Sequence, residues 1–146
     1  LRDLTIKTEQ VRPMPTDRDD PDDAARSYED ELPRNPDLLL AGVGEDGHTL
    51  SLFPGSSVLT EENRRVAAIE STAEPPIRIT CTPPVVRQAR NVLVLAHGAK
   101  KANAVGAALA PEGTVEQTPA RLLRRGEWFV DREAAEHIDE HPEAAE

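Results

Sequence analysis

A short apolar run passes directly into a glycine-rich loop at residues 37–55, whose sequence is DLLLAGVGEDGHTLSLFPG. The apolar residues predict a buried strand, and the glycines at positions 42, 44 and 47 predict an irregular loop at its carboxyl end. In α/β proteins, ligands bind beyond the carboxyl ends of the strands. This stretch therefore predicts an α/β fold with functional side chains on the loop.

The glycines of this loop also match the GxGxxG spacing of dinucleotide-binding proteins. Such a loop must open a helix whose N-terminus receives the pyrophosphate, but Pro54 and Gly55 end any helix within about two turns. Glu45 and Asp46 would also place negative charge against a negative ligand. A nicotinamide or flavin site is therefore not assigned.

The rest of the chain alternates predicted strands and helices. Strands are predicted at 37–41, 66–69, 77–82, 91–96 and 127–131, and helices at 22–32, 84–89, 99–109, 119–123 and 132–138. After their first residues, Asp37 and Asn91, the strands at 37–41 and 91–96 are continuously apolar, which is typical of a parallel sheet buried on both faces. We expect a mainly parallel sheet with helices on both faces, a Rossmann-like three-layer αβα fold, with 37–41 as its central strand.

Length and composition restrict the organisation of the chain and its partners. The 146 residues are about one domain long, so we expect a single domain at 1–138 and a disordered acidic tail at 139–146. The net charge of −10 disfavours nucleic acid and anionic membranes as partners. The single Cys81 excludes an intrachain disulfide, which fits a cytoplasmic location, and no run of about twenty apolar residues predicts a membrane span.

His48 and Asp46 are the strongest candidates for catalysis. The imidazole at a strand end can take a proton from water, and the carboxylate two residues away can orient it because the intervening Gly47 lets both side chains face one pocket. The alternatives are a loop histidine bonded to the backbone and an aspartate that only forms the turn.

Two further positions predict anion binding. Arg78 lies on a strand face otherwise decorated with threonines, and its guanidinium can bind a phosphate or a carboxylate unless it is simply solvated. Residues 98–101, Gly-Ala-Lys-Lys, form a strand-to-helix junction where free backbone N–H groups and a lysine make an anion site. No HExxH motif is present, and the HxxxH spacing of His137 and His141 only flanks the acidic tail, so no metal site is assigned. Ser51 and Ser56 lack the GxSxG context of a hydrolase nucleophile.

Residues 40–55 closely resemble the signature of the 6-phosphogluconolactonases, within the group that also holds the glucosamine-6-phosphate isomerases. Supporting matches follow in the expected order at 76–80, 98–102 and 128–131. The resemblance covers nearly the whole chain from about Val11. It implies a metal-independent carboxylic ester hydrolase, without a cofactor, that converts 6-phospho-D-glucono-1,5-lactone to 6-phosphogluconate in the oxidative pentose phosphate pathway.

The resemblance also implies a role for each site residue. His48 would be the general base, Asp46 would orient it, and Arg78 and Lys101 would hold the 6-phosphate, with Lys101 preferred over Lys100 because it directly precedes Ala102 as in the family. The active-site loop would include Gly44, Gly47 and Thr49.

The chain departs from the family pattern at its beginning. The Gly-Gly-Ser phosphate cradle and the Asp-Glu-Arg segment of the family are both missing, and the chain begins with Leu1, so we expect a C-terminal fragment that hydrolyses no lactone in isolation. Two alternative functions stay open, namely an isomerase or deaminase and a non-catalytic sugar-phosphate-binding module. Phe53 disfavours the isomerase, because the resemblance implies a glutamate at that position and a phenyl ring cannot transfer protons.

Overall fold

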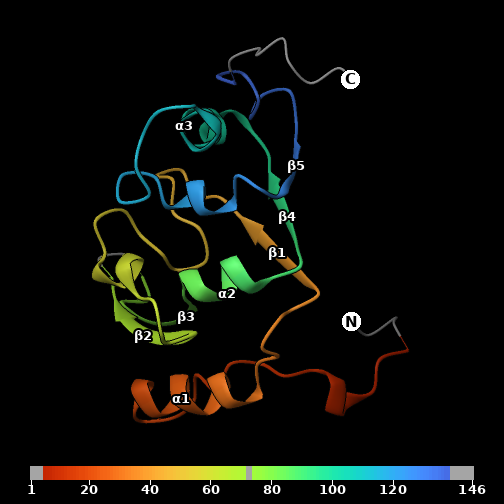
Figure 1. Ribbon diagram of the computed structural model, residues 1–146, viewed down its shortest axis with the longest axis vertical. Helices are drawn as coiled ribbons and strands as arrows, with labels where there is room; N and C mark the ends of the chain where they lie inside the picture. The colour runs from red at the N-terminus through yellow and green to blue at the C-terminus, as the bar shows by residue number, and fades with distance from the viewer. Residues whose placement is uncertain (1–4, 72–73, 139–146) are drawn as a thin grey trace.

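The computed structural model describes residues 5–71 and 74–138 (Figure 1). The predicted acidic tail at 139–146 lies outside these residues. The strands are β1 Leu38–Gly42, β2 Val66–Glu70, β3 Ile77–Cys81, β4 Asn91–Ala96 and β5 Glu127–Val130, and the α-helices are α1 Pro21–Glu31, α2 Pro83–Gln88 and α3 Ala102–Leu109. Short 3₁₀ helices occur at η1 Thr8–Gln10, η2 Ser57–Thr60, η3 Ala99–Lys101 and η4 Pro119–Leu123. No helix within the described ranges is long and apolar enough to cross a membrane.

Aspartate and proline mark the starts of α1 and α2, each one residue before the predicted start. Asp20 caps α1 because its carboxylate accepts hydrogen bonds from the backbone N–H groups of Asp22 and Asp23, and Pro21 occupies the first turn. Pro83 likewise opens α2.

The predicted helix at 132–138 is wrong, because residues 132–137 form turns. Tertiary contacts override the helical pattern here. Ala134 is fully buried in the core, and the backbone of His137 packs so closely on α3 that a Cβ on Gly106 would lie 2.6 Å from the His137 carbonyl oxygen. The conformation of this segment is therefore determined by its packing on α3 and the core rather than by its own helical preference.

The parallel sheet has three strands in the order β1-β4-β5. The prediction of 37–41 as the central strand is therefore wrong for the described sheet, since β4 lies in the middle and β1 at an edge. β2 and β3 form a separate antiparallel hairpin that packs on α1. Figure 1 shows α1 below this hairpin, away from the parallel sheet. The short connection between β2 and β3 allows only antiparallel pairing, since parallel strands need a longer crossover.

One face of the parallel sheet carries the main core. Side chains that alternate along β1 and β4, such as Ala41, Val92 and Val94, pack against α2, α3 and η4. Leu123 of η4 is fully buried in this cluster. Figure 1 shows α2, α3 and η4 on the same side of the strands. The α/β class and the parallel sheet are thus confirmed.

The opposite face of the sheet is apolar and exposed among the described residues. The exposed fraction is 54% for Leu38, 58% for Leu40, 50% for Leu95 and 50% for Phe129. The parallel register places all four on one face, because Gly42 pairs with Leu95 and Leu95 with Phe129. Parallel sheets are normally covered on both faces. We call this surface the open sheet face.

We expect the open sheet face to make the chain self-associate and bind apolar dyes. Replacing Leu40 and Leu95 together by lysine is expected to lower dye fluorescence at least about twofold and to shift the chain toward the monomer in sedimentation, because the charges interrupt the apolar surface. Val11→Lys, at an apolar residue that is 42% exposed outside the sheet, is the matched control. A wild-type chain that stays monomeric and binds no dye contradicts this expectation.

Candidate active site

The loop at residues 43–56 leaves β1 at the carboxyl edge of the parallel sheet. The N–H of Gly44 donates to the carbonyl of His48 at 2.8 Å, and the N–H of Gly47 donates to the carbonyl of Gly44 at 3.1 Å. The fully buried Thr49 donates its hydroxyl to the carbonyl of Gly42 at 2.9 Å. The N–H of Ala120 in η4 donates to the carbonyl of Gly47 at 2.9 Å. These bonds fix the loop to the sheet and to η4.

Two glycines of this loop are required for different reasons. Gly47 has a positive φ of 83°, a conformation that L side chains rarely adopt. Gly44 leaves room for the histidine ring, since a Cβ there would lie 2.1 Å from Nδ1 of His48 and 2.6 Å from Oδ1 of Asp46. Gly44 is thus packed against the candidate catalytic pair.

His48 and Asp46 form the predicted pair. Nδ1 of His48 lies 2.6 Å from Oδ1 of Asp46, and the same oxygen accepts the backbone N–H of His48 at 3.1 Å. Partial burial alone would raise the pKa of Asp46, but these hydrogen bonds from His48 outweigh it and hold the pKa below the usual range. An ionised carboxylate only accepts hydrogen bonds, so Nδ1 of a neutral His48 carries the proton and Nε2 keeps its lone pair. This arrangement suits a general base.

The side chain of Phe53 links Arg78 to this pair. Its ring centroid lies 4.6 Å from the centroid of the His48 ring, and the Cζ atom of Arg78 lies 5.4 Å from the Phe53 centroid. Arg78 also donates Nε to the carbonyl of Pro75 at 3.0 Å and Nη2 to the carbonyl of Glu74 at 2.7 Å. Arg78 and His48, which are distant in sequence, therefore contact the same phenyl ring.

Thr80 binds the loop to β3, a role that was not predicted from the sequence. The buried Thr80 accepts the backbone N–H of Ser51 at 3.0 Å through its hydroxyl oxygen. Thr80 and Arg78 are two residues apart on a strand and share one face. The alternation of polar residues on β3 signalled this face, but not the segment that lies against it.

Lys101 lies at the same edge of the sheet as the loop. It follows β4, the parallel neighbour of β1, and the carboxyl ends of parallel neighbours meet at one edge. Lys101 is partly buried whereas Lys100 is exposed. Convergence of Lys101 and Arg78 on one anion stays a prediction.

The backbone N–H groups of Gly98 and Ala99 at this strand-to-helix junction are not free, contrary to the sequence prediction. The N–H of Gly98 donates to both carboxylate oxygens of Asp131 at 3.0 Å, and the N–H of Ala99 donates to Oε2 of Glu133 at 3.3 Å. Hydrogen bonds from the N–H groups of Ala134 and Gly98 lower the pKa of Asp131. The chain thus supplies its own anions, which leaves the lysine ammonium as the cationic group of this junction.

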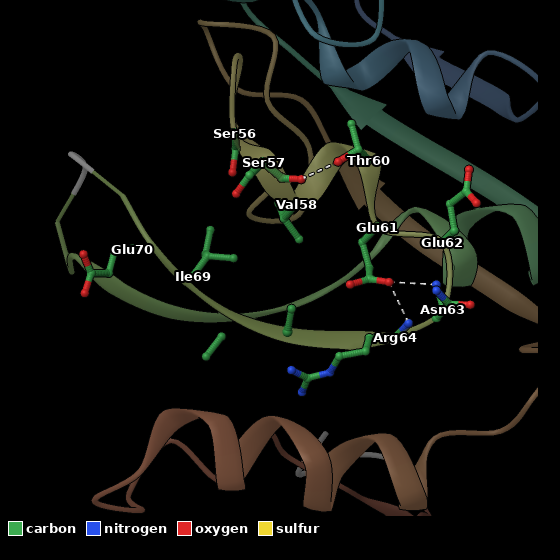
Figure 2. Close-up of a pocket in the computed structure, with 12 residues that line it drawn as sticks. Ser56, Ser57, Val58, Thr60, Glu61, Glu62, Asn63, Arg64, Ile69 and Glu70 are labelled. Atoms are coloured by element: carbon green, nitrogen blue, oxygen red, sulfur yellow. Dashed lines mark hydrogen bonds between the residues drawn. The ribbon is translucent and has the colours of Figure 1, made fainter.

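Two cavities differ in their relation to this site. A cleft of about 270 Å³ is lined by Arg78, Ser51 and the start of α1, so it adjoins the loop. A larger pocket of about 640 Å³ lies between η2 and β2 (Figure 2). There the carboxylate of Glu61 accepts the N–H groups of Asn63 and Arg64 at 2.7 and 3.0 Å, and none of the predicted site residues lines the pocket. Of the predicted site residues, Arg78 lines the smaller cleft, whereas His48, Asp46 and Lys101 do not.

Comparisons with known proteins agree on one group. The family described as glucosamine-6-phosphate isomerases/6-phosphogluconolactonase matches residues 1–130. The chain is 38% identical over 151 aligned residues to a 6-phosphogluconolactonase of Synechocystis, covering 94% of this chain and 62% of that protein.

Solved structures show the same similarity. A 6-phosphogluconolactonase of Trypanosoma brucei has a TM-score of 0.68 at 35% identity, covering 80% of this chain and 53% of that one. A monomeric glucosamine-6-phosphate deaminase has a TM-score of 0.68 at 25% identity, covering 82% of this chain and 56% of that one. The chain thus spans between about half and three-fifths of the length of these proteins.

Proposed function

The chain belongs to the family of glucosamine-6-phosphate isomerases and 6-phosphogluconolactonases, and on this basis we propose that it carries the catalytic loop of a hydrolase acting on 6-phospho-D-glucono-1,5-lactone. The observation that carries the proposal is the pair of His48 and Asp46, joined at 2.6 Å, with Phe53 contacting both the His48 ring and the guanidinium of Arg78. The product, 6-phosphogluconate, belongs to the oxidative pentose phosphate pathway.

The proposed reaction uses His48 first as a base and then as an acid. Nε2 of His48 takes a proton from water while the water oxygen attacks the lactone carbonyl carbon, and the carbonyl oxygen becomes an oxyanion. The imidazolium is stabilised by the ionised Asp46. As the carbonyl re-forms, the bond to the ring oxygen breaks and the imidazolium returns its proton to that oxygen. The ring opens to the hydroxy acid, and no external reactant other than water is needed.

The proposed phosphate site combines Arg78 with Lys101. A guanidinium can bind two phosphate oxygens at once, and an ammonium adds a point charge. Asp131 and Glu133 already occupy the nearby backbone N–H groups, so binding of the dianion depends on the two side chains rather than on a helix end.

The isomerase or deaminase alternative is supported by the structural similarity to a glucosamine-6-phosphate deaminase. Phe53 argues against it, because its phenyl ring contacts His48 where proton transfer would need an acid. The non-catalytic binding module is disfavoured by the intact pair of His48 and Asp46, which phosphate binding alone would not require.

The proposal is tested by hydrolysis of freshly generated 6-phosphogluconolactone. Two proteins are compared, namely this chain and a fusion that adds the part of the Synechocystis relative that the chain does not match. We expect the fusion to hydrolyse the lactone above the spontaneous rate and to leave glucosamine 6-phosphate unchanged. Binding of 6-phosphogluconate without hydrolysis would instead support the binding module, and deamination would support the isomerase group.

Replacing Arg78 by alanine in an active form is expected to lower kcat/KM for the phosphorylated lactone by about ten- to a hundredfold, as for a lost charge-assisted bond. The loss for unphosphorylated glucono-1,5-lactone should be much smaller. Lys101→Ala should behave like Arg78→Ala, and Lys100→Ala, at an exposed neighbour, is the matched control. Equal losses on both lactones would show that Arg78 does not recognise the phosphate.

A further inference from the structure

Phe53 contacts both of the groups to which different roles are assigned above. Its ring is tilted by 41° to the ring of His48 with the centroids 4.6 Å apart, and the guanidinium carbon of Arg78 lies 5.4 Å from its centroid. The proposed base comes from the loop after β1, whereas the proposed phosphate-binding group comes from β3. One side chain thus touches both parts of the candidate site.

The backbone at Phe53 is held in place on both sides. The preceding Leu52 is fully buried, donates its N–H to the carbonyl of Thr49 at 2.8 Å and pairs with Thr49 in an isolated β-bridge. The carbonyl of Phe53 accepts the N–H of Ser56 at 3.1 Å. The Phe53 ring, which is itself partly buried, therefore extends from a fixed point rather than from a free loop.

Each neighbour of the ring also has a second, independent restraint. Asp46 holds His48 through Nδ1, in the plane of the imidazole, while Phe53 packs against the ring. Two backbone carbonyls hold Arg78 through Nε and Nη2, while its guanidinium lies over the phenyl ring. Aromatic faces attract cations and neighbouring rings without exchanging protons with them. Removing the ring would therefore leave the His48 ring held only by Asp46 and the Arg78 guanidinium held only on the side of its two backbone carbonyls.

We propose that Phe53 is a positioning residue that sets the placement of His48 relative to Arg78. This inference rests on the proposed function, since the spacing between base and phosphate-binding group then selects sugar lactones whose carbonyl and phosphate lie at opposite ends. In this positioning role, Phe53 does not touch the reacting atoms of the lactone or of the attacking water. It acts through the two side chains that do.

The structural part of the test can be carried out on the chain whether or not it hydrolyses a lactone. Side-chain NMR spectra of the chain report the imidazole protons of His48 and the Nε–H of Arg78, which both lie within the ring-current field of Phe53. We expect Phe53→Leu to shift both sets of signals, Phe53→Tyr to leave both near their wild-type positions, and Phe129→Leu, at the other phenylalanine, to move neither. Phe53→Met replaces Phe53→Leu if the latter fails to fold.

Removing the ring current alone shifts nearby signals, so the decisive NMR readout is the mobility of the two side chains. Order parameters of His48 and Arg78 should both fall in Phe53→Leu and be kept in Phe53→Tyr. A variant that lacks the ring but keeps both side chains as ordered as in the wild type overturns the proposal, and so does loss of order in one group only.

The kinetic part uses an active form of the protein. Phe53→Leu is expected to lower kcat/KM for the phosphorylated lactone by about ten- to a hundredfold, as for a small misplacement of reacting groups, and to affect unphosphorylated glucono-1,5-lactone less. Phe53→Tyr should restore the phosphorylated activity, and Phe129→Leu should keep it. Unchanged kinetics in Phe53→Leu overturns the positioning role. If the wild type hydrolyses no lactone, the proposed function fails, while the order parameters still decide whether Phe53 holds the two side chains.

Discussion

Replacing His48 by glutamine in an active form of the protein is expected to lower kcat for lactone hydrolysis by about a hundredfold or more, with little change in KM. Glutamine keeps a polar side chain of similar length but cannot take a proton from water. The folded state should persist, since the His48 side chain is 31% exposed and holds no part of the core. Initial rates with the phosphorylated lactone and melting temperatures measure both effects.

His97→Gln is the matched control for this experiment. His97 is exposed just after β4, so the same chemical change there should leave kcat unaltered. Asp46→Asn should give a smaller loss than His48→Gln, because it removes the charge that fixes the Nδ1–H tautomer but leaves the imidazole in place. Near-normal turnover of the His48→Gln variant would remove His48 from the mechanism.

Replacing Gly44 by alanine is expected to cost as much activity as replacing the histidine itself. The added Cβ would lie 2.1 Å from Nδ1 and 2.2 Å from Cε1 of His48, distances at which atoms overlap, and 2.6 Å from Oδ1 of Asp46. The histidine ring must therefore move, and its bond to the carboxylate breaks. We expect a loss in kcat of about a hundredfold, measured together with the 15N shifts that report the tautomer of His48.

Gly42→Ala is the control within the same motif. A Cβ at Gly42 meets only the carbonyl oxygen of Leu95 at 3.7 Å, an ordinary van der Waals contact, so this variant should stay active. Both glycines precede the catalytic pair in the signature, but only Gly44 adjoins it. Full activity of Gly44→Ala with an unchanged tautomer would show that the pair tolerates displacement, which contradicts the geometric argument.

The pairing of His48 with Asp46 was predictable because it is local. The two residues are separated only by Gly47, whose positive φ follows from a turn that the sequence already indicated. The strand bounds were equally accessible, since an apolar run such as that of β4 allows few other interpretations. Family membership followed from the order of several motifs along the chain and is confirmed.

Contacts between distant segments were not predictable in this way. Phe53 meets Arg78 where Thr80 binds the loop to β3, and neither segment by itself indicates which segment lies against it. The N–H groups at residues 98 and 99 looked free because the carboxylates that bind them lie more than thirty positions away.

Sequence by itself therefore determined the α/β class, most element bounds and the chemistry carried on the loop after β1. Periodicity and residue type depend on residues that are close together in the chain, so these features can be predicted without knowledge of the tertiary structure. Tertiary structure alone decided that β1 lies at an edge of the described sheet, that residues 132–137 form turns, and that one apolar face is exposed. Each of these depends on which distant surface is present to pack against, because burial is a property of the assembled chain and not of a residue.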